Sequence, residues 1–162
     1  MKKLFIILSA MVCLIGCSTS TEDVIYSLSL ASVKDHISTG YLDGDIASFE
    51  ATENAYSTIK SKIAAYRSEY ITGAEWIENV NSGKFSKSDK SARTRFNTAE
   101  SALESLQSEC EAIVKGIPSS AKGYFVISSV LSLSRFNEGK TTVLEEKEFS
   151  VSFDGDDGAN IR

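Results

Sequence analysis

The chain has 162 residues, of which 42% are hydrophobic and 24% are charged, and its formal net charge at pH 7 is −5. This length suffices for one domain with a hydrophobic core of its own. A net negative charge argues against a nucleic-acid-binding protein and against broad electrostatic adhesion to anionic lipid.

The first residues form a positively charged start followed by a short apolar run. Lys2 and Lys3 precede the apolar stretch Leu4 to Ile15, which only Ser9 interrupts. About a dozen apolar residues are too few to cross a bilayer, because a spanning helix needs roughly 20. The pattern is typical of a secretory signal peptide.

The end of this run, Leu14-Ile15-Gly16-Cys17, resembles the lipobox of bacterial lipoproteins (aliphatic, aliphatic or small, Gly or Ala, Cys). The resemblance covers this segment alone. It implies that signal peptidase II removes residues 1–16, that the thiol of Cys17 receives a diacylglycerol, and that the new amine is acylated. Several acyl chains would anchor the chain stably, since each buried CH₂ contributes about 0.8 kcal/mol. We therefore expect a cell-envelope protein that is attached to the membrane through an N-terminal lipid.

The residue after the lipidated cysteine bears on location. In Gram-negative lipoproteins a serine there, here Ser18, favours the outer membrane, while the face on which the domain lies stays open. Two alternatives remain for the leader: an ordinary secretory signal cleaved near residues 18–20, and an uncleaved anchor.

The rest of the chain divides simply. Loss of the leader removes two lysines and takes the net charge from −5 to about −7. We expect a signal peptide over residues 1–16, which is removed, and a lipidated Cys with a short tether over 17–23. A single domain over 24–154 and a polar tail over 155–162 follow.

Three cysteines are present, and they predict no intramolecular disulfide. Cys13 would leave with the signal peptide and Cys17 would carry the lipid, so Cys110 would remain alone. Cys110 falls on an apolar helical stripe, which predicts a buried, small hydrophobic side chain rather than a redox or nucleophilic group.

Residues 24–37 fit two interpretations. Tyr26, Leu28 and Leu30 alternate with serines as in a strand, whereas apolar residues spaced four and three apart from Val24 fit one face of a helix. A threonine that can cap the segment and a glycine that can end it favour the helix. We expect a short N-terminal helix here, with a strand as the open alternative.

Two long helices are predicted next, over about 46–80 and 89–116. Each carries apolar residues at alternating spacings of three and four, the seam of packed helices. The first seam is Phe49, Thr52, Tyr56, Ile59, Ile63, Tyr66 and Tyr70, and the second is Ala92, Phe96, Ala99, Leu103, Leu106, Cys110, Ile113 and Ile117. Gly73 is a possible break in the first helix. The short loop between the helices predicts an antiparallel helical hairpin.

The periodicity changes to two after Ser120. Apolar residues alternate with serines over 123–137, a turn follows at Asn137 to Lys140, and alternation resumes to Asp154. A lone hairpin is marginal in water, so this one must dock on the helices or pair with the 24–33 segment. The predicted fold class is α+β: a long antiparallel helical hairpin with a C-terminal β-hairpin, about 123–154, packed on it.

No catalytic, metal or cofactor site is predicted. His36 stands beside Asp35, but no Gly-x-Ser-x-Gly elbow accompanies them. Glu145, Glu146 and Glu148 lie on a predicted strand, where successive side chains point to opposite faces. The acidic stretch that begins at Asp154 resembles the opening of a calcium loop but lacks the terminal glutamate of an EF-hand, so a solvated tail is expected.

A basic cluster is the candidate contact for a partner. Lys84, Phe85, Lys87 and Lys90, followed by Arg93 and Arg95, are unusual in an acidic chain. Cations near a helix N-terminus oppose the macrodipole, which favours a functional role, here contact with an anionic partner through an aromatic anchor. The alternative is a solvated turn with lysines at a helix start.

The tyrosines at positions 56, 66 and 70 are expected in the core, with hydroxyls that reach water, rather than around a ligand groove. The leading function is a non-enzymatic interaction or structural subunit of the envelope, with a protein partner or self-association through the helices and no nucleic acid. The alternative is a small-ligand-binding module, or an inhibitor of an envelope-acting enzyme, with a Tyr- and Phe-lined pocket between hairpin and helices.

Overall fold

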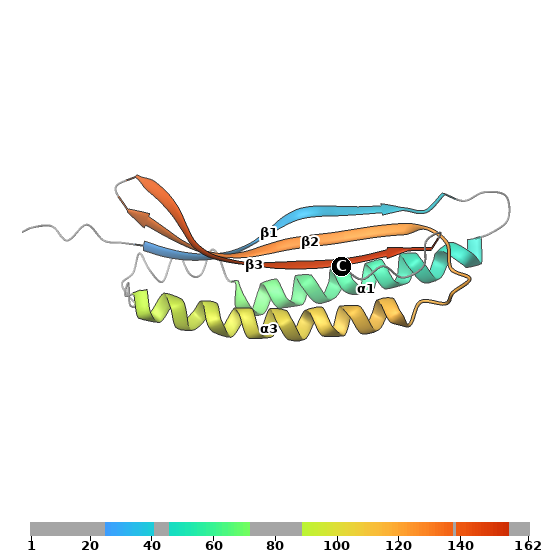
Figure 1. Cartoon of the computed structure of the whole chain (residues 1–162), viewed down its shortest axis with the longest axis horizontal. Coiled ribbons are helices and arrows are strands. Elements are labelled where there is room, and N and C mark those ends of the chain that lie inside the picture. The colour runs from blue at the N-terminus through green and yellow to red at the C-terminus, as the bar shows by residue number, and fades with distance from the viewer. Residues whose placement is uncertain (1–24, 41–45, 72–88, 138, 156–162) are drawn as a thin grey trace, which may run out of the picture.

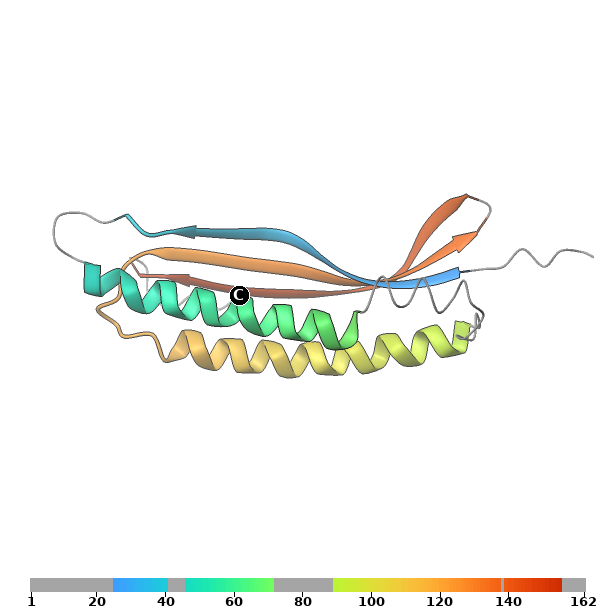
Figure 2. The same cartoon turned by 180° about the vertical axis from the view of Figure 1, so that it is seen from behind.

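The computed structural model describes residues 25–40, 46–71, 89–137 and 139–155. They form three strands and two helices in the order β1 (Ile25–Ser38), α1 (Ile46–Tyr70), α3 (Asp89–Lys115), β2 (Tyr124–Asn137) and β3 (Lys140–Asp154). The three strands make one antiparallel sheet with β2 in the centre. Both helices lie on the same side of that sheet, so the molecule is an elongated two-layer structure (Figures 1 and 2).

The predicted arrangement of the sheet was wrong. The expected C-terminal hairpin is present as β2 and β3, but it is part of a three-stranded sheet whose first strand precedes the helices. The segment expected as a short helix is β1, in which Leu28 lies opposite Leu133 and Leu30 opposite Leu131. The alternation of apolar residues with serines in this segment therefore indicated the correct structure. Pairing with β2 gives each of these leucines a packed neighbour, which an isolated short helix would lack.

The predicted helical pair is confirmed in its described part. α3 covers the expected range almost residue for residue, and α1 begins at Ile46 as predicted. The described helix ends at Tyr70, where the amide of Ile71 still donates to the carbonyl of Arg67. The remainder of the predicted range to 80, and the possible break at Gly73, lie outside the described residues.

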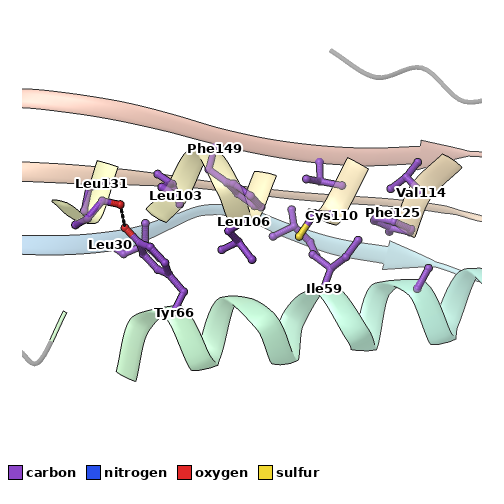
Figure 3. Packing of buried hydrophobic residues seen from close by; sticks show 14 of the residues in the cluster. Leu30, Ile59, Tyr66, Leu103, Leu106, Cys110, Val114, Phe125, Leu131 and Phe149 are labelled. Atoms are coloured by element: carbon purple, nitrogen blue, oxygen red, sulfur yellow. Dashed lines mark hydrogen bonds between the residues drawn. The ribbon is translucent and has the colours of Figure 1, made fainter. Parts of the chain in front are cut away.

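The core lies between the helix pair and one face of the sheet (Figure 3). The α3 seam is buried as predicted from Ala92 to Cys110, although Val114 rather than Ile113 completes it. From the sheet, Phe125, Leu131 and Phe149 are almost wholly buried against these helices. The two seams thus pack within the chain, against each other and against the strands.

Two irregularities bend the sheet. The register of β1 against β2 shifts at Val33, and that of β3 against β2 shifts at Leu144, so each of these residues is an extra one in its strand. Bulges of this kind increase local twist and bend a strand. Beyond Leu144 the tip of the β2–β3 hairpin turns away from the helices (Figure 1).

The other end of the sheet is closed tightly by the α3–β2 connection. The buried hydroxyl of Thr52 donates to the carbonyl of Lys122 at 2.7 Å, and the Lys122 amide donates to the carbonyl of Ser48. Gly155 lies so close that an added Cβ would be 2.5 Å from the Ala121 carbonyl oxygen. This end is therefore a fixed joint between α1, β2 and β3.

Candidate functional site

Most of the sequence-predicted contact residues lie outside the described residues. These are Cys17 at the lipobox, and Lys84, Phe85 and Lys87 of the basic cluster. Lys90 is described, and its side chain is exposed in the first turn of α3. It remains a candidate contact.

The two arginines that follow are tied to the sheet. Arg93 forms an ion pair with Glu145 of β3. Arg95 is partly buried beside Tyr26 and Leu133, and burial lowers the pKa of its guanidinium. They therefore orient α3 on the strands, and this part of the cluster is less available to a partner than the sequence predicts.

Asp35 and His36 point to opposite faces of the sheet. The Asp35 carboxylate accepts a 2.5 Å hydrogen bond from the Tyr56 hydroxyl and pairs with the Lys60 ammonium, both on α1. His36 lies on the helix-free face, with its ring 6.3 Å from that of Tyr124. Successive strand residues alternate in this way, so the two side chains form no Asp–His dyad.

Cys110 is fully buried in the seam of α3, as predicted. Burial raises the pKa of its thiol from 9.0 to about 11, so it stays protonated at neutral pH. A buried neutral thiol is a poor nucleophile and a poor metal ligand. The structure gives it a packing role.

The tyrosines are only partly as predicted. Tyr66 is buried, but its hydroxyl donates to the Ala99 carbonyl at 2.6 Å instead of reaching water. Tyr70 is partly buried with its ring 5.1 Å from that of Tyr66, beside a shallow groove of about 330 Å³ between α1 and α3. The ion pair of Lys62 with Glu109, at 2.7 Å, links the two helices along this groove.

The space between sheet and helices, where a pocket was expected, is largely closed in the described part of the molecule. That space is filled by aromatic and aliphatic side chains (Figure 3). Hollows of about 80 Å³ beside Asp35, Lys60 and Arg67 and of about 10 Å³ beside Arg95 lie there. Pockets for drug-sized ligands are typically about 300–1,000 Å³. These hollows between sheet and helices are therefore too small for a drug-sized ligand, whereas the groove of about 330 Å³ between α1 and α3 reaches that range.

Three charged side chains of β3 have partners within the chain. Glu145 and Lys147 face the helices, Lys147 bridging to Glu104 at 2.8 Å, while Glu146 on the opposite face accepts a hydrogen bond from Ser132. Within the described ranges no group of three or more potential ligands could hold a metal ion. Of the predicted acidic tail, Asp154 ends β3 and residues 156–162 are outside the description.

On the helix-free face of the sheet no described element is packed (Figures 1 and 2). Every second residue of each strand points there, apart from the bulges, and the commonest residue among them is serine, of which Ser132 and Ser134 are themselves buried: Ser27, Ser29, Ser38, Ser128, Ser132, Ser134, Ser150 and Ser152. Among the serines stand apolar residues that stay in contact with water, namely Val33, Phe136 and Val143, which are 65%, 43% and 51% exposed. We call this surface the open face.

The open face is hollowed near its middle. A depression of about 250 Å³ lies beside the bulge in β1, lined by Val33, Ser128, Ser129, Val130, Glu148, Phe149 and Ser150. Small residues let a partner approach the strands closely, and Val33 and Val130 offer apolar contact. The arrangement is that of a binding depression with an apolar centre and one carboxylate.

Sequence reasoning missed this surface for one reason. The serines that alternate with apolar residues in 24–33 and 124–134 were its signal, but they indicate an open face only once three strands are known to lie side by side. With the segment 24–33 taken as a helix, the serines have no common surface.

Neither a family model nor a curated protein nor a solved structure matches this chain. None of the described helices is long and apolar enough to cross a membrane. Fold and surface thus define a class only: a two-layer α+β domain with one helix-covered and one open sheet face.

Proposed function

We propose that this protein is a lipid-anchored, non-enzymatic subunit of the bacterial cell envelope that binds a protein partner through the open face of its sheet. The anchor follows from the lipobox at Cys17, and Ser18 favours the outer membrane. The observation that supports the binding role is the 250 Å³ depression at Val33, on a sheet face that no described helix covers.

The composition of the open face supports a protein rather than a small molecule as the partner. The depression is lined by Val33 and Val130 among serines, together with the carboxylate of Glu148. Protein interfaces commonly combine an apolar centre with a polar, solvent-exposed rim. Because the helix seams are used inside the chain, we place the contact on the sheet and no longer on the helices.

The experiment is photo-crosslinking in native membranes with the full-length chain. A photoreactive residue replaces Val33, and the matched control carries it at Ile46, an apolar residue of equal exposure (66% against 65%) at the closed end of the molecule. We expect one protein adduct of defined mass at position 33 that is absent at 46. The added change Val130→Glu should abolish that adduct.

Mass spectrometry of the mature N-terminal peptide tests the anchor separately. We expect a diacylglyceryl group on Cys17, and no lipid-modified product from Cys17→Ser. Equal adducts at positions 33 and 46, or none at either, would refute the binding surface, and an unmodified Cys17 would refute the anchor.

A further inference from the structure

A second feature of the sheet lies at its outer end, where the β2–β3 hairpin turns away from the helices (Figure 1). Phe136 and Val143 are on the open face of this tip and lie diagonally across the two strands, since Phe136 pairs with Thr141 and Ser134 with Val143. Diagonal partners are about 7–8 Å apart, within reach of an aromatic side chain. Phe136 and Val143, which are 43% and 51% exposed, thus form one apolar patch.

Cations lie near this patch. Arg135 and Lys140 are exposed on the opposite face of the same hairpin tip, since each is one residue out of phase with the patch, and Lys90 is exposed at the start of α3, which lies at the same end of the molecule (Figures 1 and 2). The sequence places one acidic residue, Glu138, between the strands. Two cations and one acidic residue give the hairpin tip, residues 135–141, a formal charge of +1 in a chain of net charge −5.

The same end is where the chain arrives from its proposed lipid anchor. The first residue of β1, Ile25, pairs with Phe136. Cys17 is eight residues earlier, and eight residues span at most about 28 Å whatever their conformation. β1, with 14 residues, extends about 45 Å from there to the closed end of the molecule. The anchor therefore holds the hairpin tip near the membrane and leaves the closed end free to lie farther away.

We propose that the hairpin tip is a second membrane contact: Phe136 and Val143 enter the interface of the bilayer that holds the lipid of Cys17, and Arg135 and Lys140 contact its phosphates. Exposed apolar side chains bordered by cations have the composition that binds membrane interfaces. The inference rests on the proposed lipid anchor. Its consequence is a fixed orientation, in which the sheet stands away from the membrane and the open face stays accessible to a partner.

The test places an environment-sensitive nitrobenzoxadiazole fluorophore on the full-length, lipidated chain in vesicles of phosphatidylethanolamine and phosphatidylglycerol. One chain is labelled at Thr141→Cys, the cross-strand partner of Phe136, and the other at Ser120→Cys, an exposed site at the closed end. Both carry Cys110→Ala so that one thiol reacts. We expect a several-fold rise in emission with a blue shift at 141, and a water-like spectrum at 120.

A pair of matched variants separates apolar contact from mere proximity. Phe136→Ser with Val143→Ser should return the probe at 141 to a water-like spectrum, whereas Val33→Ser, which removes a still more exposed apolar side chain from the middle of the open face, should leave the probe buried. Circular dichroism of each variant checks that the fold is kept.

The remaining outcomes overturn the inference in distinguishable ways. Water-like spectra at both positions on a chain that floats with the vesicles would remove the tip contact and leave the anchor standing. Burial at both positions would mean that the molecule lies flat. A chain without lipid on Cys17 that does not float would refute the anchor, and with it the tip contact.

Discussion

The two faces of the sheet are made by alternate residues of the same three strands, yet they are chemically different. On the helix-covered face Phe125, Ile127 and Leu131 are at most 2% exposed, whereas on the open face Val33 and Val143 are more than half exposed. An antiparallel sheet tolerates water on one face, because alternation places polar side chains there. Here the polar side chains are mostly serines, which are too short to cover the strands.

This difference separates stability from recognition. The helix-covered face supplies the buried apolar area that drives folding, and its packing leaves room only for small hollows. The open face buries fewer side chains, namely Val126, Ser132 and Ser134, so its exposed residues are free to vary with a partner. Changes on the two faces should therefore have unequal effects on the free energy of unfolding.

The largest expected contrast is between two phenylalanines of β2. Phe125→Ala removes a fully buried ring that packs edge-on against Tyr56, and core truncations of this kind cost about 3–5 kcal/mol. Phe136→Ala removes a ring that is 43% exposed, and we expect a loss below about 1 kcal/mol. Chemical denaturation followed by circular dichroism measures both. Equal losses would mean that the open face is covered by a layer of packed residues.

A second prediction uses the buried thiol of the helix-covered face. The pKa of Cys110 is about 11 in the folded chain against an ordinary value of 9.0, because burial disfavours the thiolate. The folded state thus holds a proton that the unfolded state releases, and stability falls as pH rises from about 9 to 11, by up to about 1.4 kcal/mol per pH unit. Below pH 9 both states are protonated and this contribution is constant.

The control for this pH effect is Cys110→Ala, which should show a shallower fall of stability between pH 9 and 11. Tyr66, whose pKa burial also raises, contributes to the fall in both chains, so only the difference between them reports on the thiol. Identical slopes would show that Cys110 ionises as freely in the folded chain as in the unfolded one.

The helices could be predicted from sequence because their signal is local and long. The α3 seam repeats through Phe96, Leu103 and Cys110, and Gly116 and Pro118 mark its end. The strand β1 could not, because its partner β2 is about 100 residues away along the chain and a short alternating segment also fits a helix. Only the pairing with β2 distinguishes the two, and that is a long-range property.

The candidate surfaces were hidden by the same limit. Neither the depression at Val33 nor the patch of Phe136 with Val143 is continuous in sequence, since each joins residues from different strands. The basic cluster was visible, but sequence does not show that Arg93 pairs with Glu145 on β3. The sequence shows which residues are charged, but the partner of each charge depends on how the strands are arranged in the sheet.

The smallest contrast lies between adjacent residues of β1. Asp35, on the helix-covered face, holds the Tyr56 hydroxyl and the Lys60 ammonium in a partly exposed cluster, so Asp35→Ala should cost about 0.5–1 kcal/mol. His36→Ala, one residue later on the open face, should change stability by less than about 0.5 kcal/mol. The same denaturation experiment, repeated in high salt, should shrink the Asp35 effect and leave that of His36 unchanged, because salt screens an exposed ion pair. If His36→Ala proved the more damaging change, the open face would hold a packed partner at this position, and the contrast between the two faces would fail where neighbouring residues test it most directly.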